Sequence, residues 1–242
     1  MSRNICSRRD NPASARNVLV RLQIAIRKSQ IVNSVLTRLF LIRHAEVEAR
    51  YQSVFGGRID MEISPRGHEQ AAALADFLRR KKLDAIYASP MKRVQQTLAP
   101  LLNNGAPQPT IMTDLREVDF GDWTGHGWDA VKEKFGATAF EWLHHLERGT
   151  IPNAEPLDVY RARVEPCLRE ILSRNPGQRV AVFCHGGVIR MMLSILLELP
   201  LSKMSAFDFD YASVSEIEWQ PQRMEIQLLN FTPWRTPYGK CP

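Results

Sequence analysis

The sequence is poor in cysteine and has no long apolar run. Its 242 residues include only four cysteines, and no two of them form a CxxC pair. This excludes a secreted scaffold held by disulfides, and we expect a cytoplasmic protein, because thiols stay reduced there. The longest apolar stretch runs from Met191 to Leu197 with a serine inside it, far short of the roughly 20 residues that span a bilayer. We expect no transmembrane helix and no membrane partner.

Most of the chain also lacks a net charge. The total is +6, from 32 Lys and Arg against 26 Asp and Glu, but residues 1–34 hold seven basic residues and a single acid. The other 208 residues have 25 of each sign and are neutral overall. A domain that binds nucleic acid carries a basic excess of its own, so we expect no nucleic-acid partner.

Residues 1–34 form a basic leader, which we place outside the globular domain of residues 35–242. Arg21, Arg27 and Lys28 interrupt the position where a secretory signal peptide has its apolar core. The leader is rich in Arg and nearly free of acids, a composition closer to that of an organelle transit peptide. A start codon assigned too far upstream is the other interpretation. We expect the domain to work without the leader.

The pattern of apolar runs and helix signals predicts an α/β protein. Three short apolar runs, each ending in polar residues, are typical of strands buried on both faces: 36–43, 86–89 and 180–184. Helical segments separate them and a hairpin follows; the helices span 64–82, 90–104, 159–174 and 188–197, and the hairpin strands 213–219 and 224–231. Strands that alternate with helices predict a three-layer α/β/α fold with a mostly parallel central sheet.

The residues that follow the three predicted strands carry the chemistry. Arg43 and His44 end the first strand, the second leads to Arg93, and His185 follows the third. Ligands of an open parallel sheet bind beyond the carboxyl ends of its strands, so we expect these four side chains to converge. The two glycines after His185 then open a helix, whose N-terminus favours an anion. The expected ligand is a phosphoryl group.

Five motifs, in order, resemble those of the histidine phosphatase superfamily, in its phosphoglycerate mutase-like branch. Leu41-Ile42-Arg43-His44-Ala45-Glu46 is similar to the family's Arg-His-Gly motif, and Cys184-His185-Gly186-Gly187 to its second histidine motif. Three further motifs stand between them. A loop and the first helix of the family match Gly57-Arg58-Ile59-Asp60, Ile63-Ser64, Gly67 and Gln70-Ala71, and the second arginine motif matches Ser89-Pro90, Arg93 and Gln96-Thr97. The acid-bearing loop of the phosphatase members matches Leu115-Arg116-Glu117 with Phe120-Gly121-Asp122-Trp123. The resemblance covers about residues 36–231. It implies a phosphoglycerate mutase-like fold, with residues 35–242 as the histidine phosphatase domain.

The resemblance also implies a role for each residue of the site. His44 is the expected nucleophile, which becomes a phosphohistidine and divides one difficult transfer into two easier ones. Arg43 and Arg93 are expected to bind the phosphoryl oxygens, with His185 as a further donor in its imidazolium form. Glu117 is expected to protonate the leaving group and then to activate water. The substrate-binding set also includes Gly186, Arg50 and Gly57. No metal and no cofactor are implied, because side chains supply the positive charge.

The chain departs from the family pattern at three places. Ala45 replaces the usual glycine after the nucleophile, and we expect activity to survive the added methyl group. Arg50 stands where many members have an asparagine near the phosphate, and it either contacts substrate or points to water. Residues 152–156 replace the usual Gly-Glu-Ser, which alters one expected contact on the phosphate side. Trp123 and Trp128 either wall the substrate cavity or pack in the interior.

The acid loop and the short second histidine motif are similar to those of alpha-ribazole and broad-specificity phosphatases. We therefore expect a phosphomonoesterase that hydrolyses a small phosphorylated metabolite through a phosphohistidine. A phosphoglycerate mutase, which returns the phosphoryl group to the substrate, is the first alternative, although the longer segment that mutases have before the second histidine motif is not apparent. The second alternative is a non-catalytic phosphate-recognising module, with the leader as a docking arm. A homodimer is compatible with the sequence.

Overall fold

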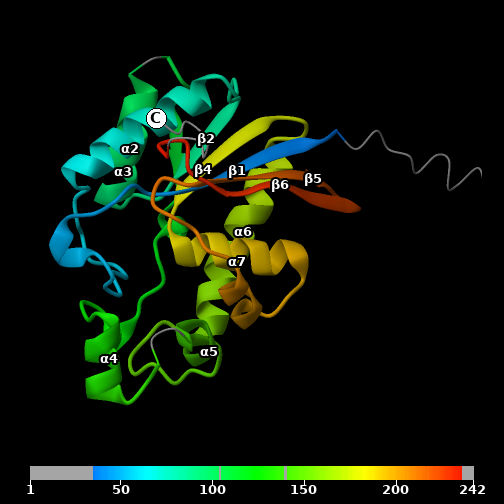
Figure 1. Cartoon of the computed structure of the whole chain (residues 1–242). Helices are drawn as coiled ribbons and strands as arrows, with labels where there is room; N and C mark the ends of the chain where they lie inside the picture. The colour runs from blue at the N-terminus through cyan, green and yellow to red at the C-terminus, as the bar shows by residue number, and fades with distance from the viewer. Residues whose placement is uncertain (1–34, 104, 139–140, 236–242) are drawn as a thin grey trace, which may run out of the picture. The chain divides into compact units, whose positions relative to one another are not determined.

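The computed structural model describes residues 35–103, 105–138 and 141–235 (Figure 1). The basic leader of residues 1–34 lies outside these residues, so its separation from the domain stays a prediction. Within the described part, the sheet has six strands in the order β3-β2-β4-β1-β5-β6. Their bounds are β1 Thr37–Arg43, β2 Ala85–Ala88, β3 Pro109–Ile111, β4 Arg179–Cys184, β5 Val214–Gln220 and β6 Arg223–Phe231.

The sheet is mostly parallel, as the sequence predicts. The strands β3, β2, β4 and β1 run in one direction, whereas β5 is antiparallel to β1 and β6 is antiparallel to β5. Arg43, the last residue of β1, lies opposite Cys184, the last residue of β4. The residues that follow these two central strands therefore emerge side by side, and β2 ends next to them.

Helices cover both faces of the sheet, because the central strands are apolar on both. Leu39 and Leu41 of β1 belong to one core, Phe40 and Ile42 to the other, and all four are fully buried. Burying one such side chain stabilises the fold by about 1.5–3 kcal/mol. A shift of β1 by one residue would exchange the two sets of side chains between the faces of the sheet, so this burial fixes the register of the strand. The first core is covered by α6 (Leu157–Arg174) and α7 (Gly186–Leu197), and the second by α2 (Pro65–Arg79) and α3 (Lys92–Leu102) (Figure 1).

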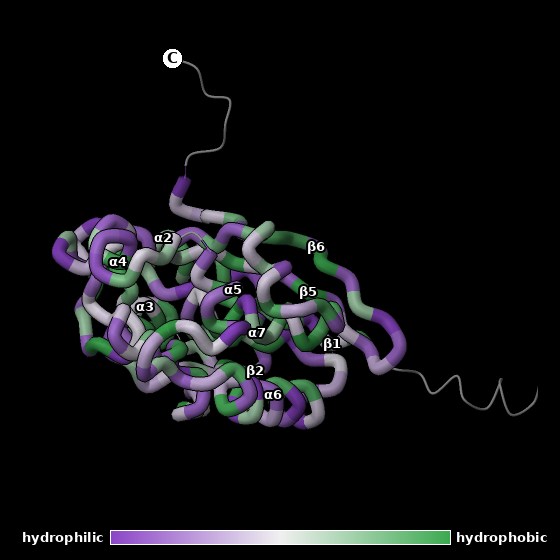
Figure 2. Tube along the Cα trace, turned by 90° about the horizontal axis from the view of Figure 1, so that it is seen from below, coloured by the Kyte–Doolittle hydropathy of each residue, from purple (hydrophilic) through white to green (hydrophobic). Residues whose placement is uncertain are grey.

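Local signals set where these helices begin. The Ser64 hydroxyl oxygen accepts a hydrogen bond from the N–H of Gly67 at 2.9 Å, and Pro65 takes the first helical position of α2, where no N–H is needed. α7 begins at Gly186, directly after His185. Figure 2 shows purple and green alternating along the helical segments, the pattern of helices with one polar and one apolar side.

Two short helices, α4 (Trp128–Phe135) and α5 (Trp142–Glu147), lie away from the sheet between β3 and α6 (Figure 1). The sequence patterns did not predict them or the three-residue strand β3, because each is too short to show a clear period. Short 3-10 turns complete the described chain at Ala49–Tyr51, Thr113–Leu115, Gly121–Trp123 and Leu201–Ala206. In this part of the chain no helix is both long and apolar enough to cross a membrane.

Candidate active site

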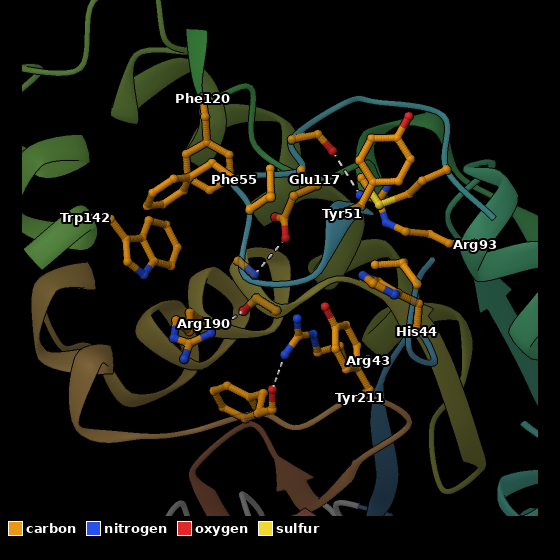
Figure 3. A pocket seen from close by; sticks show the side chains of 18 of the residues that line it. Arg43, His44, Tyr51, Phe55, Arg93, Glu117, Phe120, Trp142, Arg190 and Tyr211 are labelled. Carbon is orange, nitrogen blue, oxygen red and sulfur yellow. Dashed lines mark hydrogen bonds between the residues drawn. The ribbon is translucent and has the colours of Figure 1, made fainter. Parts of the chain in front are cut away.

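A cavity of about 470 Å³ lies at the carboxyl ends of the central strands (Figure 3). His44 follows β1, and Arg93 lies in the first turn of α3, which follows β2. His185 follows β4, and its ring centroid is 5.3 Å from that of His44. Arg43, His44, Arg93 and Glu117 all line the cavity. The structure therefore brings together the side chains that the sequence predicts to converge.

His44 is held as a neutral imidazole with one nitrogen free. Its Nδ1 is 2.8 Å from the carbonyl oxygen of Ala45, and because a carbonyl only accepts hydrogen bonds, Nδ1 carries the proton. The lone pair is then on Nε2. Burial, together with the positive charges of Arg93 and Arg43, lowers the pKa of His44 well below its usual 6.5. Both effects favour the neutral imidazole with a free lone pair on Nε2.

Ala45 fits where the family has glycine. Its side chain is fully buried in the core under α2 and α3, and its φ angle is not positive, so the backbone does not require glycine. The Ala45 N–H donates to the hydroxyl of Thr97 at 2.8 Å, and this hydroxyl donates to the carbonyl of Arg93 at 2.7 Å. These bonds tie the residue after His44 to α3, the helix that carries Arg93.

Arg93 is held by the loop that contains Gly57. It is 2 % exposed, and its two terminal nitrogens donate to the carbonyls of Gly57 and Ile59, each at 2.9 Å. Burial lowers its pKa to about 10, so it stays charged at neutral pH. Its Nε is buried without a partner. Gly57 lines the cavity at a positive φ of 45°, and its contact to Arg93 gives it a positioning role that the sequence analysis missed.

Arg43 lies on the other side of His44. It donates to the carbonyl of Phe209, and its guanidinium carbon lies 4.2 Å from the ring centroid of Tyr211. Its Nε is also buried without a partner. Within the described residues, neither Arg43 nor Arg93 is ion-paired with a carboxylate. The cavity thus holds two positioned cations with donors to spare, an arrangement suited to a phosphoryl group.

His185 is fully buried, and its protein surroundings favour the neutral form. Burial, Arg93, His44 and Arg43 all lower its pKa well below 6.5, so the expected imidazolium would depend on a bound dianion alone. Its Nε2 is 3.0 Å from the hydroxyl oxygen of Ser89, which also accepts from the N–H of Met91. If Ser89 donates to Nε2, the proton of the ring is on Nδ1, which is buried without a protein partner.

Glu117 is held at the N-terminus of α7. One carboxylate oxygen accepts from the backbone N–H of Gly187 at 3.1 Å and the other from that of Val118 at 3.0 Å. A Cβ on Gly187 would lie 2.3 Å from the Glu117 carboxylate, a distance that real Cβ atoms do not show. The second glycine of the histidine motif therefore makes room for the acid. Its neighbour Gly186 lines the cavity beside Arg43.

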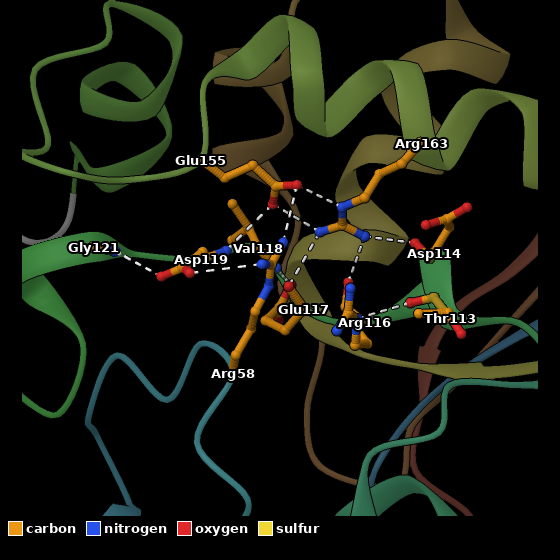
Figure 4. Close-up of polar contacts among 10 residues, drawn as sticks. All are labelled: Arg58, Thr113, Asp114, Arg116, Glu117, Val118, Asp119, Gly121, Glu155 and Arg163. Carbon is orange, nitrogen blue, oxygen red and sulfur yellow. Dashed lines mark hydrogen bonds and ion pairs between the residues drawn. The ribbon is translucent and has the colours of Figure 1, made fainter.

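Arg163 of α6 fixes the loop that carries the acid, a contact that the sequence analysis missed (Figure 4). Its Nη1 donates to the carbonyls of Asp114 and Arg116 at 2.5 and 2.7 Å, and its Nη2 donates to that of Glu117 at 3.1 Å. Nε and Nη2 also bind the two carboxylate oxygens of Glu155, at 2.7 and 2.9 Å. One guanidinium group therefore holds the backbone on both sides of the acid.

Glu155 explains the unusual segment 152–156. It is 8 % exposed and also pairs with Arg58 at 3.1 Å, while it accepts from the N–H of Asp119 at 3.3 Å. Burial raises its pKa, but the hydrogen bonds and charge of Arg163 outweigh this and lower the pKa below 4.5. Glu155 does not line the cavity. The segment supports the acid loop and makes no contact on the phosphate side.

Two expected site residues, His185 and Arg50, do not line the cavity. His185 is fully buried, with its ring centroid 5.3 Å from that of His44, whereas Arg50 is not part of the site. Arg50 is exposed, lies 3.1 Å from the carboxylate of Glu48, and stacks over the ring of Tyr51. Its neighbour Tyr51 lines the cavity instead. Arg50 stays hydrated at the surface and pairs there with Glu48. It therefore does not take the place of the asparagine that other family members have.

The far wall of the cavity contains residues that the sequence analysis did not assign. Trp128 lines it and is half exposed, whereas Trp123 is 1 % exposed and packs in the core. Trp142 of α5 and Arg190 of α7 lie together on this wall. Within the described residues, no three His, Cys, Asp or Glu side chains group to hold a metal ion. That the reaction needs no metal stays a prediction.

Comparison of the sequence with known protein families identifies the family of the chain. The sequence profile described as the histidine phosphatase superfamily (branch 1) matches residues 39–232. The chain belongs to the histidine phosphatase superfamily. Its membership confirms the resemblance of the five motifs. The relatives are named phosphatases and the family is catalytic, so the chain is an enzyme of this phosphatase family.

Two curated relatives and one solved structure match over nearly their whole length. Phosphoserine phosphatase 1 of Hydrogenobacter thermophilus is 33% identical over 197 residues, which cover 81% of this chain and 93% of the relative. Adenosylcobalamin/alpha-ribazole phosphatase of Escherichia coli is 27% identical over 197 residues, 80% and 95% of the two chains. The solved alpha-ribazole phosphatase from Shigella flexneri has a TM-score of 0.70 at 25% identity and covers 81% and 96%. These likenesses confirm the fold class.

Proposed function

We propose that the chain is a phosphomonoesterase that hydrolyses a small phosphorylated metabolite through a phosphohistidine on His44. The state of His44 carries this proposal: Nδ1 is bonded to a carbonyl, so the lone pair is on Nε2, between the buried Arg93 and the partly buried Arg43. A neutral nucleophile beside positioned cations suits attack on a phosphoryl group, whose transfer depends mainly on orientation and charge stabilisation.

In the first step, Nε2 of His44 attacks phosphorus in line with the leaving oxygen. The N–P bond forms as the P–O bond breaks, and protonated Glu117 gives its proton to the departing alkoxide. The free Nε–H groups of Arg43 and Arg93 bind phosphoryl oxygens, and Nδ1–H of His185 donates to another. An alcohol leaves, and His44 carries the phosphoryl group.

In the second step, water enters on the face that the alcohol has left. Glu117, now a carboxylate, takes a proton from the water as its oxygen attacks phosphorus. The P–N bond breaks, inorganic phosphate leaves, and His44 returns to its neutral form. Because the same carboxylate acts on both sides of the intermediate, its position matters for both steps.

Hydrolysis of p-nitrophenyl phosphate and of a panel of phosphorylated metabolites, in the presence of a chelator, tests this proposal. We expect turnover by the native chain and a loss on the order of 10⁴-fold or more in His44→Ala. No turnover above the His44→Ala background on any ester would overturn the proposal and favour a binding module. Conversion of 3-phosphoglycerate that needs a bisphosphate primer and far exceeds hydrolysis would instead favour the mutase.

A further inference from the structure

The cavity has a second part, beyond the residues that bind the phosphoryl group. In Figure 3, Arg190 and Trp142 lie on one side of the cavity and Arg93 and His44 on the other, with Glu117 between them. Arg190 therefore faces the part of a substrate that leaves with the proton of Glu117.

The guanidinium group of Arg190 is fixed by neutral partners only. Nη1 donates to the carbonyl of Gly186 at 3.3 Å and Nη2 to that of Phe207 at 3.0 Å. Its central carbon lies 5.0 Å from the ring centroid of Phe209 and 5.8 Å from that of Trp142. These contacts use two of its five N–H donors and hold the plane of the group in place.

Arg190 has no counter-ion in the described part of the chain. No carboxylate forms an ion pair with it there, and its Nε is buried without a hydrogen-bond partner. Burial, with Arg43 as a further cause, lowers its pKa to about 10, so the charge is kept at a cost. A partly buried cation is stabilised when an anion reaches it, and here the open cavity is where that anion can enter.

The surroundings of Arg190 favour a carboxylate over a second phosphoryl group. A single guanidinium group matches the two oxygens of a carboxylate. Asp208 and Asp210 also line the cavity, and their negative charges oppose a second dianion. A Cβ built on Gly186 would lie 3.3 Å from Nη1 of Arg190 and 3.6 Å from Nε of Arg43. The two arginines flank one glycine, so a ligand that reaches both is short.

We propose that Arg190 binds a carboxylate of the leaving group, so that the preferred substrates are phosphomonoesters of small hydroxy acids. This inference rests on the proposed function, because it assigns the leaving group of that reaction. Loss of one charge-assisted hydrogen-bonded pair lowers kcat/KM by about ten- to hundredfold.

Two matched pairs of esters test the proposal, because the members of each pair differ in the carboxylate. O-phosphoserine is compared with phosphoethanolamine, and 3-phosphoglycerate with glycerol 3-phosphate, as ratios of kcat/KM. We expect the native chain to prefer the acid in at least one pair by about ten- to hundredfold. Arg190→Met should bring that ratio close to one, and Arg190→Lys should keep part of it.

The control is Arg174→Met, which removes one exposed positive charge at the end of α6, where Arg174 pairs with Glu170. It should leave the ratios unchanged. The proposal is wrong if the native chain shows no preference for the acid in either pair, or if Arg190→Met lowers both members equally. Turnover of p-nitrophenyl phosphate by the native chain, measured alongside, separates this result from failure of the proposed function itself.

Discussion

The carboxylate of Glu117 and the backbone of Gly187 occupy adjoining space at the start of α7. The Gly187 N–H donates to one carboxylate oxygen at 3.1 Å, and a methyl group on Gly187 would lie 2.3 Å from the other. The helix N-terminus thus binds the proposed general acid through a contact that only glycine permits. The acid cannot stay in place if this residue gains a side chain.

Gly187→Ala should therefore displace the carboxylate of Glu117 and weaken its action as the general acid. We expect kcat for an alkyl phosphate to fall by about 10²–10⁴-fold, the usual contribution of a general acid. The loss on p-nitrophenyl phosphate should be much smaller, because p-nitrophenolate leaves without a proton. The measurement is kcat for both esters in the native chain and in the variant.

Glu117→Gln is the matched control, since it removes the proton and keeps the shape. It should show the same dependence on the leaving group as Gly187→Ala. Equal losses on both esters in Glu117→Gln would mean that Glu117 is not the acid. Equal losses in Gly187→Ala alone would mean that the glycine serves another purpose.

The buried position of His44 between Arg93 and Arg43 predicts an unusual titration. Each positive charge disfavours the imidazolium, and so does burial, so His44 should stay neutral from pH 8 down to well below the usual 6.5. NMR of histidine-labelled protein measures this directly. Arg43→Met removes one cation and should raise the pKa of His44. A native His44 that titrates near 6.5 would contradict the electrostatics described above.

The ion pair between Arg163 and Glu155 should matter for stability. Arg163→Met leaves a buried carboxylate with Arg58 as its remaining cation, and the cost is about 3–5 kcal/mol when a buried pair loses one partner. Chemical denaturation of Arg163→Met, Glu155→Gln and the double variant gives the coupling. We expect the double variant to be less destabilised than the sum of the two single variants. Strict additivity would show that the pair is not coupled.

Acid should weaken the same pair. The folded pKa of Glu155 is lowered below 4.5, so its contribution is complete above the unfolded pKa and is lost as pH falls through the lower folded value. The free energy of unfolding of the native chain should decrease below about pH 4.5. Glu155→Gln should show a shallower decrease, and an equal slope in both would argue against this linkage.

The centre of the fold and of the site could be predicted because both follow from one pattern. β1, β2 and β4 are buried on both faces, so each is an uninterrupted apolar run, and the residue after each run reaches the same edge. The wall of the cavity left no such signal. Trp128 and Trp142 lie on helices of eight and six residues, too short for a helical period to show.

For individual arginines too, sequence alone predicts the role of some and not of others. Arg163 and Arg161 stand two residues apart in one basic stretch, yet only Arg163 reaches the acid loop, whereas Arg161 pairs with Glu165 on the surface. Sequence alone does not separate them. Arg190 did leave a signal, since it is the one charged residue within the apolar α7. A single charged residue in an apolar helix indicates a position in a binding site, and Arg190 does line the cavity.

Deleting residues 1–34 should leave hydrolysis intact. The described lining of the cavity runs from Arg43 to Tyr211, and the family profile matches residues 39–232. The truncated chain and the full chain should therefore have the same kcat/KM on p-nitrophenyl phosphate within about twofold. A truncated chain with a native circular dichroism spectrum but no turnover would show that the leader contributes to the site.

The most direct test of the proposed mechanism is to trap the enzyme during turnover. The native chain is mixed with substrate, quenched in alkali, which preserves phosphohistidine, and digested for mass spectrometry. The mechanism predicts one phosphoryl group on the peptide that contains His44, located on that residue, and none in His44→Ala. A phosphoryl group on any other residue, or multiple turnovers by His44→Ala at the native rate, would contradict it.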